Sequence, residues 1–160
     1  MSKRSDEALI ALRQIQRRTE LASKRLAQTA HLTPSQLQVL QILDEKGETP
    51  AGELSELTQL KQATITSLLD KLERRGLVNR RRCQLDRRRV WIKIQGDGLA
   101  ALEAAPDLLQ DTFSNRFAKL ADWEQSMLVA ALERVSSLMN AERLDAAPVL
   151  DIGALDEKPT

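Results

Sequence analysis

Basic residues gather in the middle of this 160-residue chain, and they carry its clearest chemistry. Between Lys61 and Lys93 there are eleven Lys and Arg residues against three Asp and Glu residues, a net charge of +8. The remainder holds thirteen basic and twenty acidic residues, a net charge of −7, so the total is only +1. Like charges at this density repel one another unless an anionic partner is present. The sequence therefore predicts that the central part binds a polyanion.

Residues 61–76 within this stretch have the pattern of an amphipathic helix. At 100° per residue, the three leucines at 68, 69 and 72 fall within about 60° of Ile65 and form an apolar face with it. The opposite face is small and polar, which lets a helix approach the floor of the DNA major groove. Side chains suited to hydrogen-bond base edges follow along it: Gln62, Thr64, Thr66 and Ser67. The pattern favours a recognition helix, and an ordinary solvated helix face is the alternative interpretation.

Arginines also crowd a predicted β-hairpin that follows Gly76. Segments 77–85 and 89–94 lose the helical period and contain β-branched residues, which predicts two short strands joined through a turn at Asp86. Eight arginines lie between positions 74 and 89, and Asp86 is the one acid among the residues of the turn. Phosphate is the anion that relieves such crowding most directly, although a solvated charged surface is the alternative interpretation.

The segments before the basic stretch predict three helices. In the first thirty residues, apolar positions from Ala8 to Leu26 recur at alternating steps of four and three, the seam of one long helix that needs a partner. Thr33 is the expected cap of a second helix, with a capping box and an end at Gly47. A short helix within 49–60 then precedes the recognition helix by only a few residues, which is helix-turn-helix spacing.

After the hairpin, the sequence predicts further helices and an extended tail. A helix starting near Asp97 is kinked or divided by Pro106, and Asp122 is expected to cap a last helix. The four aromatic residues are predicted on core faces, which argues against stacking on single-stranded nucleic acid: Trp91, Phe113, Phe117 and Trp123. For the acidic residues 141–160, an extended segment docked on the helices and a free tail are both open.

Composition excludes several classes of protein. Hydrophobic residues make up 42% and charged residues 29%, and no apolar run approaches the roughly 18 residues of a membrane span, so a cytoplasmic protein is expected. One cysteine and one histidine cannot form a disulfide framework or a soft metal site. Motifs for a nucleophile, a phosphate loop or paired catalytic carboxylates are missing, so we expect neither an enzyme nor a cofactor.

From about residue 5 to residue 140, the chain resembles the MarR family of bacterial transcriptional regulators. The resemblance is carried by LTPSQLQVL, by GELSELTQLKQATITSLLDKLERRGLVNR, by the Asp-Arg-Arg of the turn and by Gly98. It implies a mainly α fold with a small β-hairpin wing, a winged helix-turn-helix with N- and C-terminal dimerisation helices. The expected parts are a dimerisation helix, a DNA-binding lobe, further dimerisation helices and a tail, over 1–30, 31–96, 97–140 and 141–160.

The resemblance also implies a function and site residues. It predicts a homodimer that binds a near-palindromic operator in double-stranded DNA, usually as a repressor released by a small ligand or an oxidant. Arg88 would enter the minor groove while Asp86 orients the turn. The predicted DNA contacts are Lys61, Gln62, Ala63, Thr64, Thr66, Ser67, Lys71, Arg74, Arg80, Arg82, Asp86, Arg87, Arg88 and Arg89. Lys61 and Gln95 depart from the family because they stand where helix-capping residues are usual.

Two single residues and one other function complete the predictions. His31, at the joint of the first two helices, is a candidate for a ligand pocket, with a surface or packing role as the alternative. Cys83 lies beside arginines that would lower its pKa, so a redox role is conceivable, but an incidental cysteine is favoured. The other function is a winged-helix module that binds an acidic protein surface. The sequence does not identify the effector.

Overall fold

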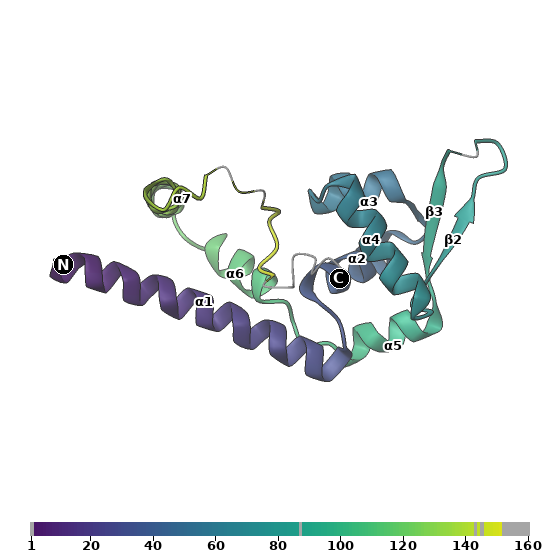
Figure 1. The fold of residues 1–160 in the computed structure, drawn as a ribbon, viewed down its shortest axis with the longest axis horizontal. Helices are drawn as coiled ribbons and strands as arrows, with labels where there is room; N and C mark the ends of the chain where they lie inside the picture. Colours follow the sequence, from purple (N-terminus) through teal and green to yellow (C-terminus); the bar gives the residue numbers. More distant parts are fainter. Residues whose placement is uncertain (1, 87, 143, 145, 152–160) are drawn as a thin grey trace, which may run out of the picture.

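The computed structural model describes residues 2–86, 88–142, 144 and 146–151 (Figure 1). Within these residues the chain forms α1 Lys3–Ala30, α2 Pro34–Lys46, β1 Thr49–Pro50, α3 Ala51–Thr58, α4 Gln62–Arg74, β2 Val78–Arg82, β3 Val90–Ile94, α5 Gly96–Ala104, α6 Leu109–Phe117 and α7 Asp122–Leu138. The order confirms the predicted winged helix-turn-helix with long helices before and after it. No helix in the described part of the chain is long and apolar enough to cross a membrane.

The start of α2 forms as its sequence predicts. Thr33 Oγ1 accepts a hydrogen bond from the Gln36 N–H (3.2 Å), and Gln36 Oε1 accepts one from the Thr33 N–H (3.1 Å). Pro34 is the first residue of α2, where a backbone N–H would have no acceptor within the helix, so the N–H that proline lacks is not needed. At the other end Gly47, with φ of +78°, ends the helix. Local chemistry alone therefore fixes both ends of α2.

The hydrophobic core lies in the lobe formed by α2, α3, α4 and the sheet. The predicted apolar face of α4 is confirmed: Ile65, Leu68, Leu69 and Leu72 are all buried. They pack in one cluster with leucines of α2 and with Ile92 of β3. This packing leaves the opposite face of α4 at the surface of the molecule.

The wing is a three-stranded antiparallel sheet in the order β1-β3-β2, rather than the two-stranded hairpin that the sequence predicts. The hairpin itself is present, with Arg80 opposite Ile92. The additional strand is Thr49–Pro50, in which Thr49 pairs with Ile92. Two residues are too short to show a strand period, and proline is tolerated because β1 is an edge strand.

The sequence C-terminal to the wing forms separate helices. Pro106 divides the predicted helix into α5 and α6, one of the two expected outcomes. Asp122 is not the cap of the last helix: Ala121 is the N-cap, and Asp122 is the first helical residue. The boundary shifts because Glu124 Oε2 accepts a hydrogen bond from the Ala121 N–H (3.1 Å), which takes over the capping role.

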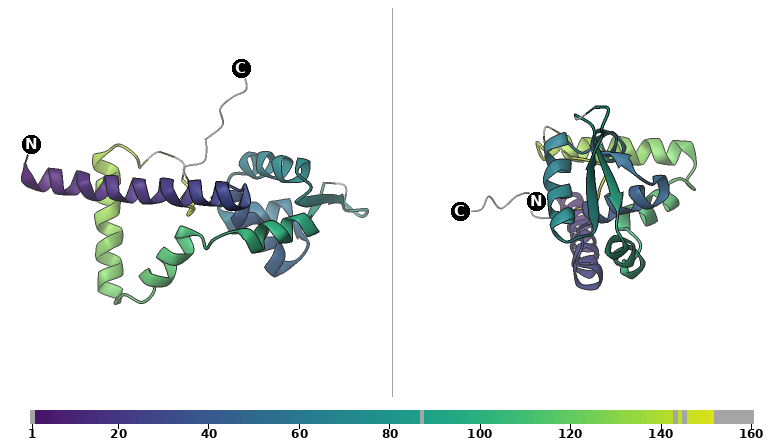
Figure 2. Two further views of the ribbon diagram at one scale, coloured as in Figure 1. Left: turned by 90° about the horizontal axis from the view of Figure 1, so that it is seen from below. Right: turned by 90° about the vertical axis from the view of Figure 1, so that its right-hand side faces the viewer.

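The long helix α1 and the helix α7 extend away from the lobe (Figure 2). None of the described residues of α6 or α7 is buried. Phe113 and Trp123 are 52% and 68% exposed, so their prediction as core residues is wrong for the single chain. The apolar period identifies an apolar face on these helices, but none of the residues that the structure describes covers Phe113 or Trp123. The α1 seam is divided in the same way, because Leu26 is buried whereas Ile15 is exposed.

The described part of the tail returns to the lobe. Asp151 accepts hydrogen bonds from Ser35 of α2, so docking is the outcome for residues 146–151. Residues 152–160, with the apolar Ile152 and Leu155 of the predicted tail, lie outside the described residues.

Candidate nucleic-acid interface

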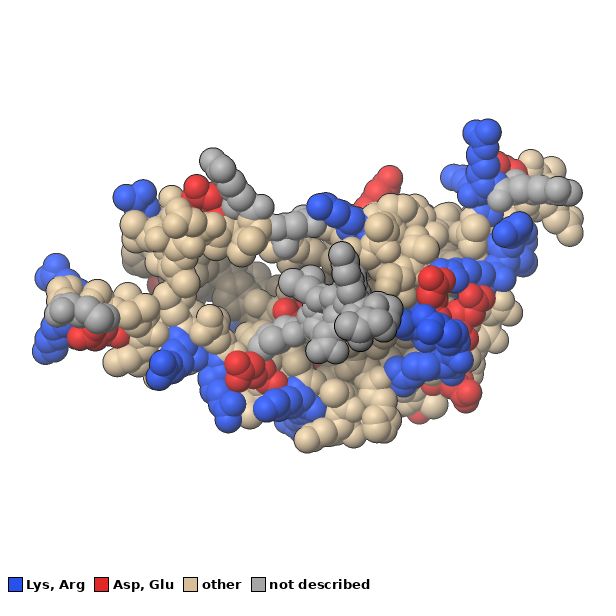
Figure 3. All heavy atoms as spheres, viewed as in Figure 1, with Lys and Arg blue, Asp and Glu red and all other residues tan. Residues whose placement is uncertain are grey.

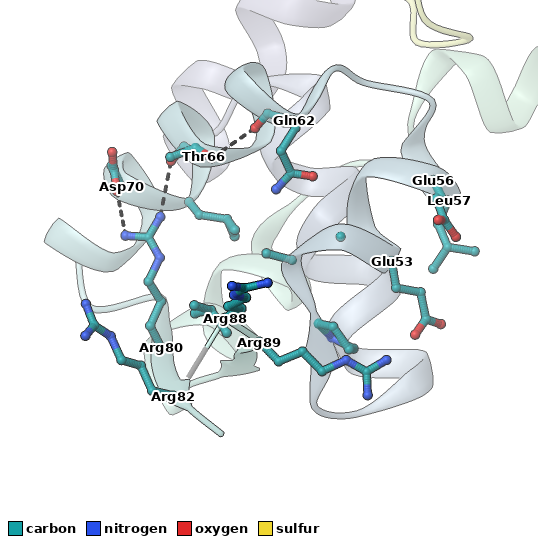
Figure 4. A pocket seen from close by; sticks show the side chains of 15 residues that line it. Glu53, Glu56, Leu57, Gln62, Thr66, Asp70, Arg80, Arg82, Arg88 and Arg89 are labelled. Atoms are coloured by element: carbon teal, nitrogen blue, oxygen red, sulfur yellow. Dashed lines mark hydrogen bonds and ion pairs between the residues drawn. The ribbon is translucent and has the colours of Figure 1, made fainter. Parts of the chain in front are cut away.

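A groove of about 1000 Å³ runs between the helix-turn-helix and the wing (Figure 4). Helix α4 contributes polar side chains on one side, and the wing contributes arginines on the other. The lining residues of these two elements are Gln62, Thr66, Leu69, Asp70, Arg80, Arg82, Arg88, Arg89 and Val90. The structure thus places part of the predicted recognition helix and four predicted wing arginines around one open space.

The surface of α4 has the exposure that base contact requires. Lys61, Gln62, Ala63, Thr64 and Thr66 are exposed, and Ser67 is half-buried. The Thr66 hydroxyl donates to the Gln62 carbonyl (2.9 Å), so its oxygen remains available as an acceptor toward an approaching group. Lys61 is the N-cap of α4 and makes no side-chain capping bond, as its residue type implies.

Some predicted contacts lie outside the groove itself. Ala63, Thr64 and Ser67 lie on α4 but do not line it. Lys71 and Arg74 are exposed near the C-terminal end of α4, where Arg74 Nε donates to the Asp70 carbonyl (3.3 Å). These side chains extend a polar and basic surface along the helix beyond the groove.

Arg80 is held by α4. Its guanidinium contacts Asp70 Oδ1, Glu73 Oε2 (2.9 Å) and the Thr66 carbonyl (3.2 Å), as Figure 4 shows for Asp70 and Thr66. The Arg80 N–H also donates to Glu73 Oε1 (3.3 Å). Partial burial by itself would lower the pKa of Arg80, but the hydrogen bonds with Asp70 and Glu73 raise it above its ordinary value. Arg80 therefore joins the wing to the recognition helix.

Arg81 points to the other side of the strand, as alternation requires. Its Nε donates to Glu48 Oε1 (2.9 Å). This hydrogen bond lowers the pKa of Glu48 and raises that of Arg81. The arginine block 80–82 therefore separates into two ion-paired side chains and Arg82, which forms no ion pair with any residue that the structure describes.

The tip of the wing presents arginines to solvent. Arg82, Arg88 and Arg89 are exposed. Asp86 Oδ1 accepts a hydrogen bond from the Arg88 N–H (3.0 Å), and the Asp86 carbonyl accepts one from the Arg89 N–H (3.0 Å). The carboxylate thus shapes the turn, as the resemblance implies. Arg87 lies outside the described residues. Lys and Arg side chains gather at this end of the molecule (Figure 3).

Helix α3 supplies groove residues that the sequence did not assign. Glu53 and Glu56 line the groove together with Leu57. Their position before the recognition helix is the signal that would have found them, because the first helix of a helix-turn-helix pair flanks the groove.

The two single-residue candidates are His31 and Cys83. His31 ends α1 in the left-handed conformation (φ 53°), its side chain is exposed, and it lines neither the groove nor the crevice beside α1. A ligand role for His31 stays a prediction. The pKa of Cys83 is lowered, chiefly by hydrogen bonds from the backbone of Asp86 and Leu85, and only in small part by Arg81. Among the described residues, no group of three or more His, Cys, Asp or Glu is placed to hold a metal ion.

Comparison with known proteins gives matches over the lobe and beyond it. The model of the MarR family matches residues 32–90. The uncharacterised HTH-type transcriptional regulator YcgE of Bacillus subtilis (strain 168) is 40% identical over 85 residues, which are 53% of this chain and 55% of that protein. The chain thus spans about half the length of YcgE in that match.

Two further similarities cover more of both chains. The uncharacterised HTH-type transcriptional regulator YsmB of the same organism is 30% identical over 108 residues, 68% of this chain and 74% of that protein. A solved MepR like protein complexed with pseudoligands is 25% identical, with a TM-score of 0.60 over 86% of this chain and 97% of that one. By its lobe, its flanking helices and these relatives, the chain belongs to the MarR family.

Proposed function

We propose that this chain is a transcriptional regulator that binds a double-stranded DNA operator as a homodimer and represses transcription until a small-molecule effector releases it. The main support for this proposal is the groove between the helix-turn-helix and the wing. The polar face of α4 forms one side of the groove, and the wing with its exposed arginines forms the other. A helix of this kind fits the major groove, and arginines on a β-hairpin fit the flanking phosphates and the minor groove.

The division of labour between the side chains follows from their surroundings. Exposed polar side chains at Gln62 and Thr66 specify sequence, because only base edges differ between one site and another. Arg82, Arg88 and Arg89 supply charge toward phosphate, since the structure gives their guanidinium groups no acidic partner among the residues it describes. Arg80 and Arg81 hold the wing in place.

Dimerisation is supported by the apolar surface of the terminal helices. Trp123, Met127 and Leu132 of α7 are each at least half exposed, as are Leu9 and Ile15 of α1. A surface this apolar on elements outside the lobe is typical of a helical interface between subunits. Two lobes joined through these helices would address half-sites about one helical turn, roughly 10 base pairs, apart.

The test is a fluorescence-anisotropy titration with duplex DNA from the region upstream of the chain's own gene. Scrambled duplex of the same length and composition is the control. A sequence-specific regulator binds its operator about a thousandfold or more tightly than the scrambled DNA at physiological salt. Binding that is equal on both duplexes and vanishes as salt rises would instead favour the winged-helix module for an acidic protein surface.

The effector is sought by its effect on stability and on the complex. A ligand held by the folded state raises the melting temperature by mass action, so metabolites of neighbouring genes form the screening set. A compound that raises the melting temperature and also releases the operator is an effector of a repressor. One that raises it and tightens operator binding would contradict release.

A further inference from the structure

The described end of the tail makes a specific contact with the first turn of α2. Ser35 donates to Asp151 Oδ2 through both its backbone N–H (3.3 Å) and its hydroxyl (2.8 Å). The Ser35 N–H is one of the first amides of the helix, which have no acceptor within the helix itself. A carboxylate at a helix N-terminus is also favoured by the helix dipole. Asp151 thus supplies the acceptor and the charge that this position requires.

The residue before Asp151 adds an apolar contact. Leu150 lines a crevice of about 20 Å³ together with Ala22 and Leu26 of α1, Pro34 of α2 and Leu108 before α6. Leu26 and Leu108 are 2% and 4% exposed. Leu150, which is 39% exposed, therefore lies partly against α1, the start of α2 and the residue before α6, next to the charged contact of Asp151.

The same junction between α1 and α2 is held from the recognition helix. The Arg75 guanidinium, at the C-terminal cap of α4, donates to the carbonyl of His31. His31 has the left-handed backbone that turns the chain from α1 into α2. The junction is thus contacted both by the end of α4 and by the tail that follows α7.

From this arrangement we propose that residues 146–151 are an intramolecular strap. The strap closes over the α1–α2 junction and fixes the angle between the DNA-binding lobe and the long helices. The strap follows α7 in the chain, and its Asp151 contacts Ser35 of α2, 116 residues earlier in the sequence. None of its residues lines the groove between α4 and the wing. The part of the proposal that concerns two lobes rests on the proposed homodimer, whereas the docking of the strap does not.

The first experiment measures hydrogen exchange of single amides by NMR. The Ser35 amide reports the strap directly, because Asp151 is its acceptor, while the Gln36 amide is bonded to Thr33 and serves as an internal reference. Asp151→Asn removes the charge from the acceptor, so we expect Ser35 to exchange about tenfold faster, with Gln36 unchanged. Glu142→Gln, which removes an exposed acid from the same tail, leaves both rates as they were.

A second pair of variants tests the apolar anchor. Leu150→Ala empties the contact in the crevice, and we expect it to speed Ser35 exchange and lower the melting temperature. Leu144→Ala is the matched control, because Leu144 is 72% exposed. Ser35 exchange that is equally fast in the unmodified chain, in Asp151→Asn and in Leu150→Ala would overturn the strap.

The angle between the lobes is measured with the chain's single cysteine. A spin label on Cys83 in each wing gives the wing-to-wing distance distribution of the dimer by dipolar spectroscopy. We expect a broader distribution in Asp151→Asn than in Glu142→Gln. Equal widths, with faster Ser35 exchange, would refute the control of the angle, and the complete absence of dipolar coupling would refute the dimer but not the docking.

Discussion

Replacing Arg80 and Arg82 in turn tests whether Arg80 holds the wing in place while Arg82 contacts DNA. The sequence places Arg80 and Arg82 together among the phosphate contacts, two positions apart on β2. In the structure, Arg80 is 24% exposed and contacts two carboxylates and a carbonyl of α4, whereas Arg82 is exposed. The pair Arg80→Ala and Arg82→Ala therefore removes the same charge from the same strand in two different surroundings.

The expected loss of stability follows from the contacts of Arg80. A hydrogen bond to a charged group contributes about 1.5 to 3 kcal/mol when it is buried. The side chains of Asp70 and Glu73 are 46% and 39% exposed, so water screens both ion pairs and each is worth about 0.5 to 1 kcal/mol. Arg80→Ala should then lower the free energy of unfolding by about 1 to 2 kcal/mol, or about 2 to 8 °C in melting temperature.

The effect on DNA should differ between the two variants. Arg82→Ala should remove one of the proposed phosphate contacts, so we expect the plot of log affinity against log salt to lose about one unit of slope while the melting temperature stays unchanged. Arg80→Ala lowers affinity by loosening the wing, with little change in slope. The intermediate variant Arg80→Lys keeps the charge but loses the planar fork that reaches two acceptors, so we expect partial recovery of stability.

The measurements are a thermal melt and an anisotropy titration at four salt concentrations for each variant. A double-mutant cycle with Asp70→Ala gives the coupling energy of the ion pair directly. The reasoning is refuted if Arg80→Ala melts like the unmodified chain and loses salt slope as Arg82→Ala does. Arg80 would then contact phosphate, as its place in the basic block suggests.

Three further changes test packing, charge and DNA contact. Gly98→Ala places a Cβ against the Leu77 carbonyl and the Ile94 side chain, so it should lower the free energy of unfolding by about 1 to 3 kcal/mol. The control is Gly96→Ala, whose Cβ would meet nothing within 4 Å and should not lower the melting temperature. Equal melting temperatures of the two variants would contradict the close contact at Gly98. Asp111 is exposed at the surface, but partial burial of its carboxyl, and then repulsion by neighbouring acids, raises its pKa. Its ionised form therefore destabilises the fold slightly as the pH rises above 3.8, and the effect is absent below that pH. Asp111→Asn should make the melting temperature less dependent on pH over that range, and an unchanged pH profile would count against the shift. Arg88→Ala should weaken operator binding by about 1 to 3 kcal/mol without lowering the melting temperature, and unchanged affinity at moderate salt would exclude its contact with DNA.

Features determined by neighbouring residues were predictable from the sequence. The capping box of α2 involves positions three apart, so the residue types at Thr33 and Gln36 determine where the helix begins. The buried face of α4 follows from the helical period in the same way. By contrast, β1 is formed by pairing with a strand some forty residues later, and two residues contain no period that would reveal it.

For a similar reason, the sequence could not show which arginines of β2 form ion pairs and which face solvent. Whether an arginine on β2 meets a carboxylate or solvent depends on the tertiary position of Asp70, Glu73 and Glu48. Counting charges along the chain identified the basic surface but not which charges are already paired. The aromatic residues of α6 and α7 show the corresponding limit for apolar patterns, because a period identifies a face and not the partner that covers it.

The contacts of α4 explain how a change at the long helices would reach DNA. Arg80 joins α4 to the wing, and Arg75 joins the end of α4 to the carbonyl of His31 at the α1–α2 junction. The wing, α4 and the α1–α2 junction are therefore linked through side chains that leave the exposed polar face of α4 free. If α4 and the wing contact DNA as proposed, a displacement of the junction would move both elements together. Since both would have to fit one half-site, we expect a change in lobe angle to reduce affinity without unfolding either element.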